Sequence, residues 1–243
     1  MAAPSVLQVR TFEAPTALTT GLALTGTTGS WTSAITAGST LILALGQRAT
    51  GNRTYSVADN VDGAWTARPV LDDGAPNGRK LQLFYIEDHT GGTVTVTVTS
   101  SVNQVVDIAA IEIGPSTFEG DSSRTAGLST DVTASGYPCS ASSTELDTSA
   151  DVFVLSAIVL ASTGTLDDPG TAGWTTWGAT ATRSHYQYKT SNSALTDEQG
   201  WIKESGSNRD YISTVAAFIA AGGGGFQSAW ASRSNTIIMG GIG

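Results

Sequence analysis

The segment Thr93–Thr99 reads Thr-Val-Thr-Val-Thr-Val-Thr, a strict alternation of two residue types. Successive side chains of an extended chain point to opposite faces, which puts all the valines on one face and all the threonines on the other. The segment therefore predicts a β-strand with one face buried and one face in water.

Other apolar segments also read as strands. Leu81–Ile86 alternates in the same way, whereas Leu41–Leu45 and Val152–Leu155 are continuous apolar runs. Continuous runs of this length are typical of central strands covered on both faces. Between the runs stand clusters of Gly, Asp, Asn and Pro, residues that favour turns, at 59–63, 72–78 and 167–170. No segment convincingly predicts a helix, so we expect an all-β protein.

The composition agrees with this fold class. The 243 residues include 35 Thr, 27 Ser and 28 Gly, but only three Lys. Hydroxyl-rich, Gly-rich chains suit strands and turns, while long helices need more Ala, Leu, Glu, Lys and Arg together. The length allows one large β domain or two small ones.

The chain also contains an internal repeat. Four elements recur in the same order at offsets between 103 and 111 residues: Leu41–Leu45 with Val152–Leu155, Gly63–Thr66 with Ala172–Thr175, Leu83–Tyr85 with Tyr186–Tyr188, and Asp107–Ile113 with Ser213–Ile219. A shared order indicates structural duplication. We expect one β-sandwich domain, residues 1–221, with pseudo-repeated halves at about 38–114 and 150–220. Both halves would contribute strands to each of its two sheets. Two separate domains are the alternative.

Charge and cysteine content exclude several classes of partner. The net charge is −9 and the isoelectric point about 4.5, without the basic surface that nucleic acid or an anionic membrane requires. No apolar stretch is long enough for a membrane span. One cysteine, Cys139, allows no intrachain disulfide, and the first residues do not resemble a signal peptide. We expect a protein made and folded in a cytoplasm.

Catalytic patterns are weak. A Ser/His/Asp set built from His185 with Asp167 or Asp168 has no nucleophile-elbow motif to support it. A paired-carboxylate glycosidase would need strand carboxylates 5–9 Å apart in a cleft, and the candidates are Glu87, Asp107 and Glu112. Glu112 alternates with Ile111 and Ile113 and so points away from their face. In a structural protein we expect Asp107 and Glu112 to lie on an open face.

Metal sites are equally weak, and no cofactor is expected. Two histidines and one cysteine make a zinc site improbable. Residues 59–63 and 72–73 offer oxygen ligands for calcium but lack the EF-hand spacing. Turn formation is the preferred explanation of these acidic residues.

The aromatic residues suggest two roles. Trp65 and Trp174 occupy matching places in the two halves, which favours paired core anchors. Trp177, Tyr186 and Tyr188 are candidates for a glycan-stacking surface.

The C-terminal segment differs from the rest. Residues 222–225 are four consecutive glycines, which predict a hinge, and residues 226–243 follow as an extended arm. The arm is too short for a core of its own yet carries exposed-prone apolar residues, so we predict that it docks on a neighbouring subunit. The residues concerned are Phe226, Trp230, Thr236, Ile237, Ile238 and Met239. Packing of this segment on its own domain is the alternative.

The strand pattern resembles a known family. The segments Gly38–Leu45, Ser56–Trp65, Leu81–Ile86, Thr93–Val98 and Asp107–Ile113, echoed in the second half, look like jelly-roll β-sandwich modules in virion proteins of tailed bacteriophages. The C-terminal Ala229–Ile238 also looks like the tail ends of such proteins. The resemblance implies a jelly-roll-type two-sheet β-sandwich and carries over no catalytic residue.

The same resemblance implies a non-enzymatic role in a virion assembled in the host cytoplasm. The protein would be a capsid decoration protein, a fibre or spike subunit, or a tail component, with other virion proteins and copies of itself as partners. A host-surface adhesin that binds glycans is the alternative function, and a glycoside hydrolase the remote one.

Overall fold

Antiparallel strands make up most of the computed structural model. It describes residues 2–14, 18–24, 31, 33–47, 53–72, 79–127, 137–140, 146–160, 166–167, 173–179, 184–196, 201–204 and 211–222. Within these ranges the only helical element is one 3-10 turn, Leu18–Thr20. The expected all-β class is confirmed. No helix within these same ranges is long and apolar enough to cross a membrane.

The N-terminal half forms two sheets. The N-terminal main sheet has the order β1 (Val6–Ala14), β10 (Val106–Ile113), β3 (Thr40–Gln47), β8 (Lys80–Ile86) and β6 (Thr66–Ala67), and β7 (Leu71–Asp72) also pairs with β8. The N-terminal cover sheet has the order β2 (Leu22–Leu24), β9 (Val96–Ser100), β4 (Tyr55–Asp59) and β5 (Gly63–Ala64). One apolar core, which includes Leu43, Phe84, Val57 and Val98, fills the space between the two sheets.

The Thr-Val alternation behaves as the sequence predicts. Val94, Val96 and Val98 are buried in this core, whereas Thr95, Thr97 and Thr99 are only half-buried. Strand β9 thus has one face toward the core and one toward solvent, and the prediction of a half-buried strand is confirmed.

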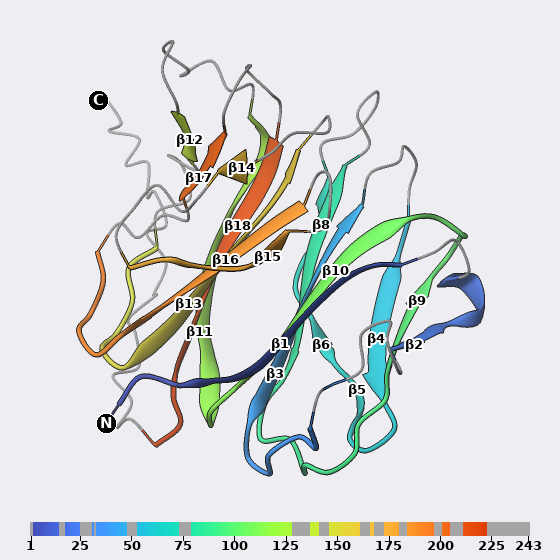
Figure 1. The fold of residues 1–243 in the computed structure, drawn as a ribbon, viewed down its shortest axis with the longest axis horizontal. Coiled ribbons are helices and arrows are strands. Elements are labelled where there is room, and N and C mark those ends of the chain that lie inside the picture. The colour runs from blue at the N-terminus through green and yellow to red at the C-terminus, as the bar shows by residue number, and fades with distance from the viewer. Residues whose placement is uncertain are drawn as a thin grey trace, which may run out of the picture.

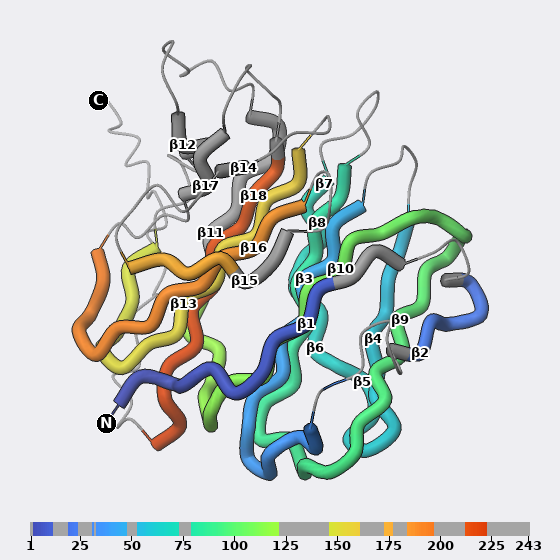
Figure 2. Tube along the Cα trace, in the orientation of Figure 1, coloured from blue at the N-terminus to red at the C-terminus, as the bar shows by residue number. Residues whose placement is uncertain are grey.

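The C-terminal half forms two further sheets. The C-terminal main sheet has the order β11 (Ser116–Gly127), β18 (Tyr211–Ala220), β13 (Val152–Leu160), β16 (Ser184–Ser191) and β15 (Thr175–Ala179). A small sheet has the order β12 (Tyr137–Ser140), β17 (Trp201–Glu204) and β14 (Leu166–Asp167). Figure 2 separates the halves by colour, blue to green for the first and mainly yellow to red for the second.

The two halves pair their strands in the same order. The elements matched in the sequence occupy equivalent places: β3 and β13 are third in their main sheets, β8 and β16 fourth, β10 and β18 second. The expectation that both halves contribute strands to each sheet is wrong, because every described sheet takes its strands from one half. The strands needed to complete each half lie outside the predicted repeats: β1 and β2 precede residue 38, and β11 and β12 fall within residues 115–150.

The two main sheets pack face to face (Figure 1). In β3, Leu41, Leu43 and Leu45 point into the N-terminal core, while Ile42 and Ala44 point toward the C-terminal main sheet. The strand is buried at every residue because a sheet covers each of its faces. Strand β13 is likewise buried throughout, so the prediction of central strands covered on both faces is confirmed.

A polar and aromatic contact closes the edge of this interface. Arg68, next to β6, donates hydrogen bonds from Nε to Asp121 Oδ2 at 3.1 Å and from Nη2 to Asp121 Oδ1 at 2.8 Å. Its guanidinium carbon lies 4.6 Å from the centre of the Phe118 ring, which stacks on Tyr85 at 5.0 Å. Residues 68 and 85 belong to the first half, and 118 and 121 to β11 of the second.

Candidate functional site

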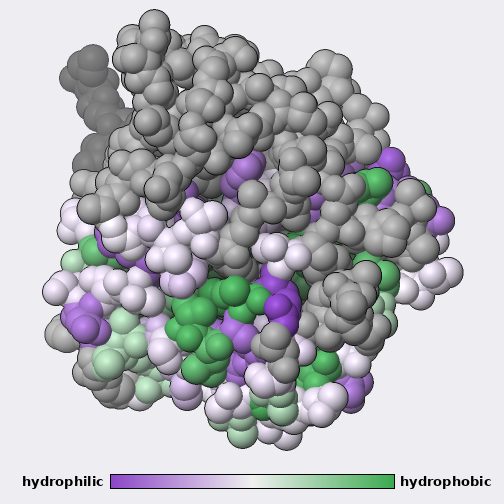
Figure 3. All heavy atoms as spheres, in the orientation of Figure 1, coloured by the Kyte–Doolittle hydropathy of each residue, from purple (hydrophilic) through white to green (hydrophobic). Residues whose placement is uncertain are grey.

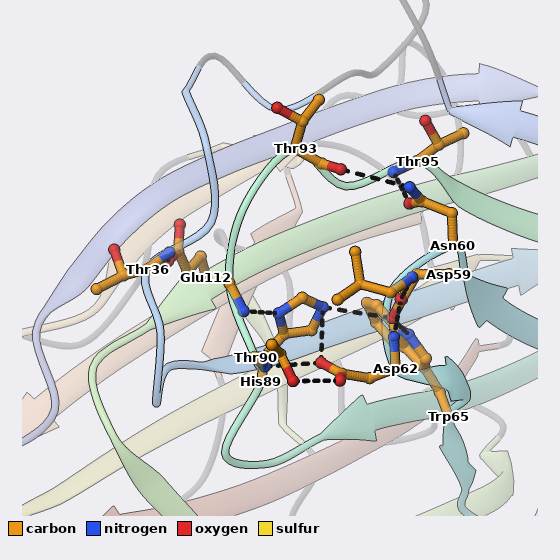
Figure 4. A network of polar contacts seen from close by, with 12 residues as sticks. Thr36, Asp59, Asn60, Asp62, Trp65, His89, Thr90, Thr93, Thr95 and Glu112 are labelled. Atoms are coloured by element: carbon orange, nitrogen blue, oxygen red, sulfur yellow. Dashed lines mark hydrogen bonds and ion pairs between the residues drawn. The ribbon is translucent and has the colours of Figure 1, made fainter.

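The densest group of titratable side chains surrounds His89 (Figure 4). Asp59 is the last residue of β4, Asp62 lies in the turn that leads to β5, and His89 follows the end of β8. Gly63 adopts a positive φ of 83°, which lets the chain reverse between β4 and β5. The hairpin turn thereby brings both carboxylates to the imidazole.

Asp59 is held by three donors from its own hairpin. Its Oδ1 accepts the backbone N–H groups of Val61 and Asp62, both at 2.7 Å, and its Oδ2 accepts the indole Nε1–H of Trp65 at 2.7 Å. Burial by itself would raise the pKa of Asp59, but these donors and nearby His89 outweigh it and lower that pKa. Asp59 therefore acts as a charged turn residue, in line with the turn interpretation of residues 59–63.

Asp62 joins the same turn to the loop after β8. Its Oδ1 accepts the Thr90 hydroxyl at 2.5 Å and its Oδ2 accepts the Thr90 backbone N–H at 2.7 Å. These bonds, that of the hydroxyl first, lower the pKa of Asp62. Asn60 makes a parallel link, because its Oδ1 accepts the Thr95 N–H at 2.6 Å.

His89 sits between the carboxylates with its ring fully buried. Nδ1 accepts the backbone N–H of Gly91 at 2.8 Å, which leaves the ring proton of a neutral imidazole on Nε2. Nε2 lies 3.3 Å from Asp62 Oδ2 and 3.5 Å from Asp59 Oδ2. The ring therefore faces the protein interior, a geometry suited to fixing the turn rather than to accepting a proton from a substrate.

The cluster is not built as a metal site. Within the described ranges, no group of three or more His, Cys, Asp and Glu side chains has an arrangement that could hold an ion. The carboxylate oxygens of Asp59 and Asp62 accept hydrogen bonds from protein donors, which a cation would have to displace.

Asp107 and Glu112 do not lie on an open face, and that expectation is wrong. Both are buried, at 0% and 1% exposure. Asp107 Oδ2 accepts the Ser184 hydroxyl at 2.6 Å across the main-sheet interface. Glu112 Oε1 accepts the Thr36 N–H at 2.7 Å, and Oε2 accepts Gln8 Nε2–H at 2.5 Å. Both faces of β10 are covered, and the buried carboxylates persist because donors match them.

The same strand geometry separates the two carboxylates. They are five residues apart on β10, so they point to opposite faces and their backbones lie about 16 Å apart at ~3.3 Å per residue. A glycosidase pair requires carboxylates on one face, roughly 5–9 Å apart. The third candidate, Glu87, accepts the Phe118 N–H at 2.6 Å and so belongs to the junction between the halves.

His185 is buried and faces away from Ser184. The two are neighbours on β16, where successive side chains point to opposite faces. Burial lowers the pKa of His185 to about 4, although nearby Asp107 acts in the opposite direction. Of its two candidate acidic partners, Asp168 and the side chain of Asp167 lie outside what the structure describes.

The aromatic candidates divide clearly. Trp65 and Trp174 are 6% and 5% exposed, which confirms them as core anchors. Tyr186 is fully buried between the main sheets, so its assignment to a glycan-stacking surface is wrong. Tyr188 is half-buried and stacks on Phe153 at 5.7 Å between ring centres. The side chain of Trp177 lies outside the described residues.

The predicted arm also lies outside the described residues, which end at Gly222. This concerns Phe226, Trp230, Thr236, Ile237, Ile238 and Met239, for which the intersubunit role stays a prediction.

No protein-family model matches the chain, and no curated protein or solved structure matches it either.

Proposed function

We propose that this protein is a non-enzymatic structural subunit of a tailed-bacteriophage particle, where it acts by assembling with other virion proteins and with copies of itself. One observation carries the proposal: the titratable residues best suited to catalysis are used inside the fold. His89, His185, Asp107 and Glu112 are all buried. For three of them, the described contacts are with groups of the protein itself.

The strand order is a second line of support. In the N-terminal half, β1-β10-β3-β8 lies opposite β2-β9-β4-β5, so that sequential strands alternate between two sheets. This is the interleaving expected of a jelly roll, the architecture common in capsid proteins. The C-terminal half repeats it in β11-β18-β13-β16 and β12-β17-β14. A repeated sandwich with many sheet edges suits a building block.

The surface chemistry also favours assembly over the recognition of nucleic acid. The chain carries 21 acidic and 12 basic side chains, and a protein of this charge is repelled by phosphate. The protein would be a decoration, fibre, spike or tail component, and these parts differ in copy number.

Quantitative mass spectrometry of purified particles tests the proposal. Particles from a bacterial strain that carries the gene should contain the protein in fixed stoichiometry to the major capsid protein. A high ratio identifies a decoration protein, and a low ratio a fibre or tail part. Absence from particles while the protein is abundant in the lysate would refute a virion role. Hydrolysis of bacterial surface glycans, lost in an Asp107→Asn or Glu112→Gln variant, would refute the non-enzymatic part.

A further inference from the structure

Strand β1 is the terminal strand of the N-terminal main sheet. It spans nine residues, Val6–Ala14, and among the described strands it pairs with β10 alone. A strand at the end of a sheet presents one side of its backbone to an additional strand, and proteins protect such edges or use them for binding.

This edge carries the most exposed large apolar side chain of the described residues, Leu7, at 44%. Leu7 lies where the register shifts between Val6 and Gln8. Val6 and Val9 on either side are half-buried and pack on the core between the main sheets. Figure 3 shows apolar side chains gathered on the face over which β1 runs in Figure 1. The surface composed of Val6, Leu7 and Val9 is called the β1 edge below.

The chain leaves the described structure beside this edge. The N–H of Ala221 donates to the carbonyl of Pro115 at 2.9 Å, and the N–H of neighbouring Gly114 donates to the carbonyl of Ser5 at 2.8 Å. Ser5 directly precedes β1. The C-terminal segment, residues 223–243, therefore begins next to the first residues of β1.

The chemistry of this segment complements the body of the protein. It contains one basic residue, Arg233, and no acidic one. The remaining chain then carries 11 basic and 21 acidic residues, a net charge of −10. The segment also holds Ile237 and Ile238, β-branched residues that favour a strand.

We propose that the β1 edge is the acceptor for Thr236–Met239 of a second copy of this chain, which adds to the sheet as a strand and covers Leu7. The inference rests on the proposed function only in taking self-assembly as its role. Between Gly222 and Thr236 the chain can extend to roughly 46–50 Å. Strand β1 itself is about 30 Å long, so the segment reaches beyond its own body. Because each copy has one donor segment and one β1 edge, the exchange closes as a symmetric pair.

Cysteine cross-linking between two chains tests the acceptor directly. The single native cysteine is first replaced (Cys139→Ser), and chains of two different masses are co-expressed, one with Leu7→Cys and the other with Ile238→Cys. Oxidation should give a covalent heterodimer on a non-reducing gel. Val70→Cys replaces Leu7→Cys in the control, because Val70 is similarly exposed, at 39%, outside β1. Equal yield with Val70→Cys, or no heterodimer, overturns the proposal.

A doubly substituted chain separates the other occupant. If Leu7→Cys and Ile238→Cys cross-link within one chain at monomer mass and not between chains, the segment packs on its own body and the proposal fails.

Sedimentation equilibrium of otherwise native protein keeps the proposal testable if the cysteine variants fold poorly. Leu7→Lys should raise the dissociation constant for self-association at least roughly tenfold, as expected from losing the burial of one leucine, whereas Val70→Lys should leave it unchanged. Unchanged association of Leu7→Lys overturns the proposal. These measurements use purified protein, so their failure is distinct from absence of the protein from particles.

Discussion

Arg68 and Asp121 form a two-point ion pair that joins the N-terminal half to the C-terminal half. The two hydrogen bonds, at 3.1 and 2.8 Å, match the planar guanidinium to both oxygens of the carboxylate. The bonds from Asp121 raise the pKa of Arg68, against the opposing effect of burial. The side chains remain 30% and 18% exposed, so solvent weakens the attraction.

Replacing Arg68 with Ala should therefore destabilise the protein modestly, by about 1–2 kcal/mol, through loss of both the ion pair and the contact with the Phe118 ring. A double-mutant cycle with Asp121→Ala, followed by urea denaturation, isolates the pair. We expect a coupling energy of roughly 0.5–1 kcal/mol. Additive effects of the two substitutions would show that the halves are joined by the apolar interface alone.

Stability should rise with pH between about 4 and 6.5 because of His185. Its folded pKa, about 4, lies below the value of 6.5 for an unperturbed histidine, so the unfolded chain binds more protons across this window. Acidification then favours unfolding, by at most about 1.4 kcal/mol per pH unit for one group. Denaturant titrations at several pH values should show this slope in the native protein and its reduction in His185→Gln. An unchanged slope would place the titration elsewhere.

Asp59 should be far more sensitive to substitution than Asp62. Asp59→Asn replaces an acceptor of three hydrogen bonds by an amide whose N–H₂ faces those same donors, and we expect a loss of about 2–4 kcal/mol in unfolding free energy. The more exposed Asp62→Asn is the matched control, with a loss of about 1 kcal/mol. Equal losses measured by thermal or urea unfolding would contradict the structure.

Both carboxylates should also contribute to acid unfolding. Their folded pKa values are lowered below the ordinary 3.8, so the stabilisation is present above that value and lost as the pH falls through the folded pKa. The native protein should lose stability below about pH 4 faster than Asp59→Asn does. Parallel acid-unfolding curves, followed by tryptophan fluorescence, would rule out this contribution.

Gly46 should not accept a side chain. A Cβ at this position would lie 2.5 Å from Ser184 Oγ and 2.9 Å from Val159 Cγ2, in the packed interface of the main sheets. Gly46→Ala should cost roughly 1–3 kcal/mol, since well-packed interiors resist insertion of a methyl group. Gly120→Ala is the control, because its nearest new contact is an ordinary 3.9 Å from Leu146. Comparable unfolding temperatures of the two variants would mean that the sheets separate easily.

The sequence predicted those parts of the fold that depend on local pattern. The alternation at Thr93–Thr99 and the apolar run at Leu41–Leu45 are both properties of a few adjacent residues. Strand β11 was harder to recognise, because its sequence, Ser-Thr-Phe-Glu-Gly-Asp-Ser-Ser-Arg-Thr-Ala-Gly, has no alternating apolar face.

The candidate site depended on contacts that no local pattern contains. Glu112 is buried because Gln8, 104 residues away, supplies a donor, and Asp107 because Ser184, 77 residues away, supplies another. Alternation correctly placed Glu112 on the face opposite Ile111. It did not indicate that a second sheet or a distant amide would cover that face.

The core shared by the main sheets also determines how the protein bears load. Ile42 of the first half and Phe153 of the second belong to the same interior, so pulling the halves apart would expose both to water at once. Each half serves as a wall of the other, and tension applied across the junction is opposed by the whole interface at the same time. The protein is therefore a rigid strut with two similar ends rather than two beads on a string.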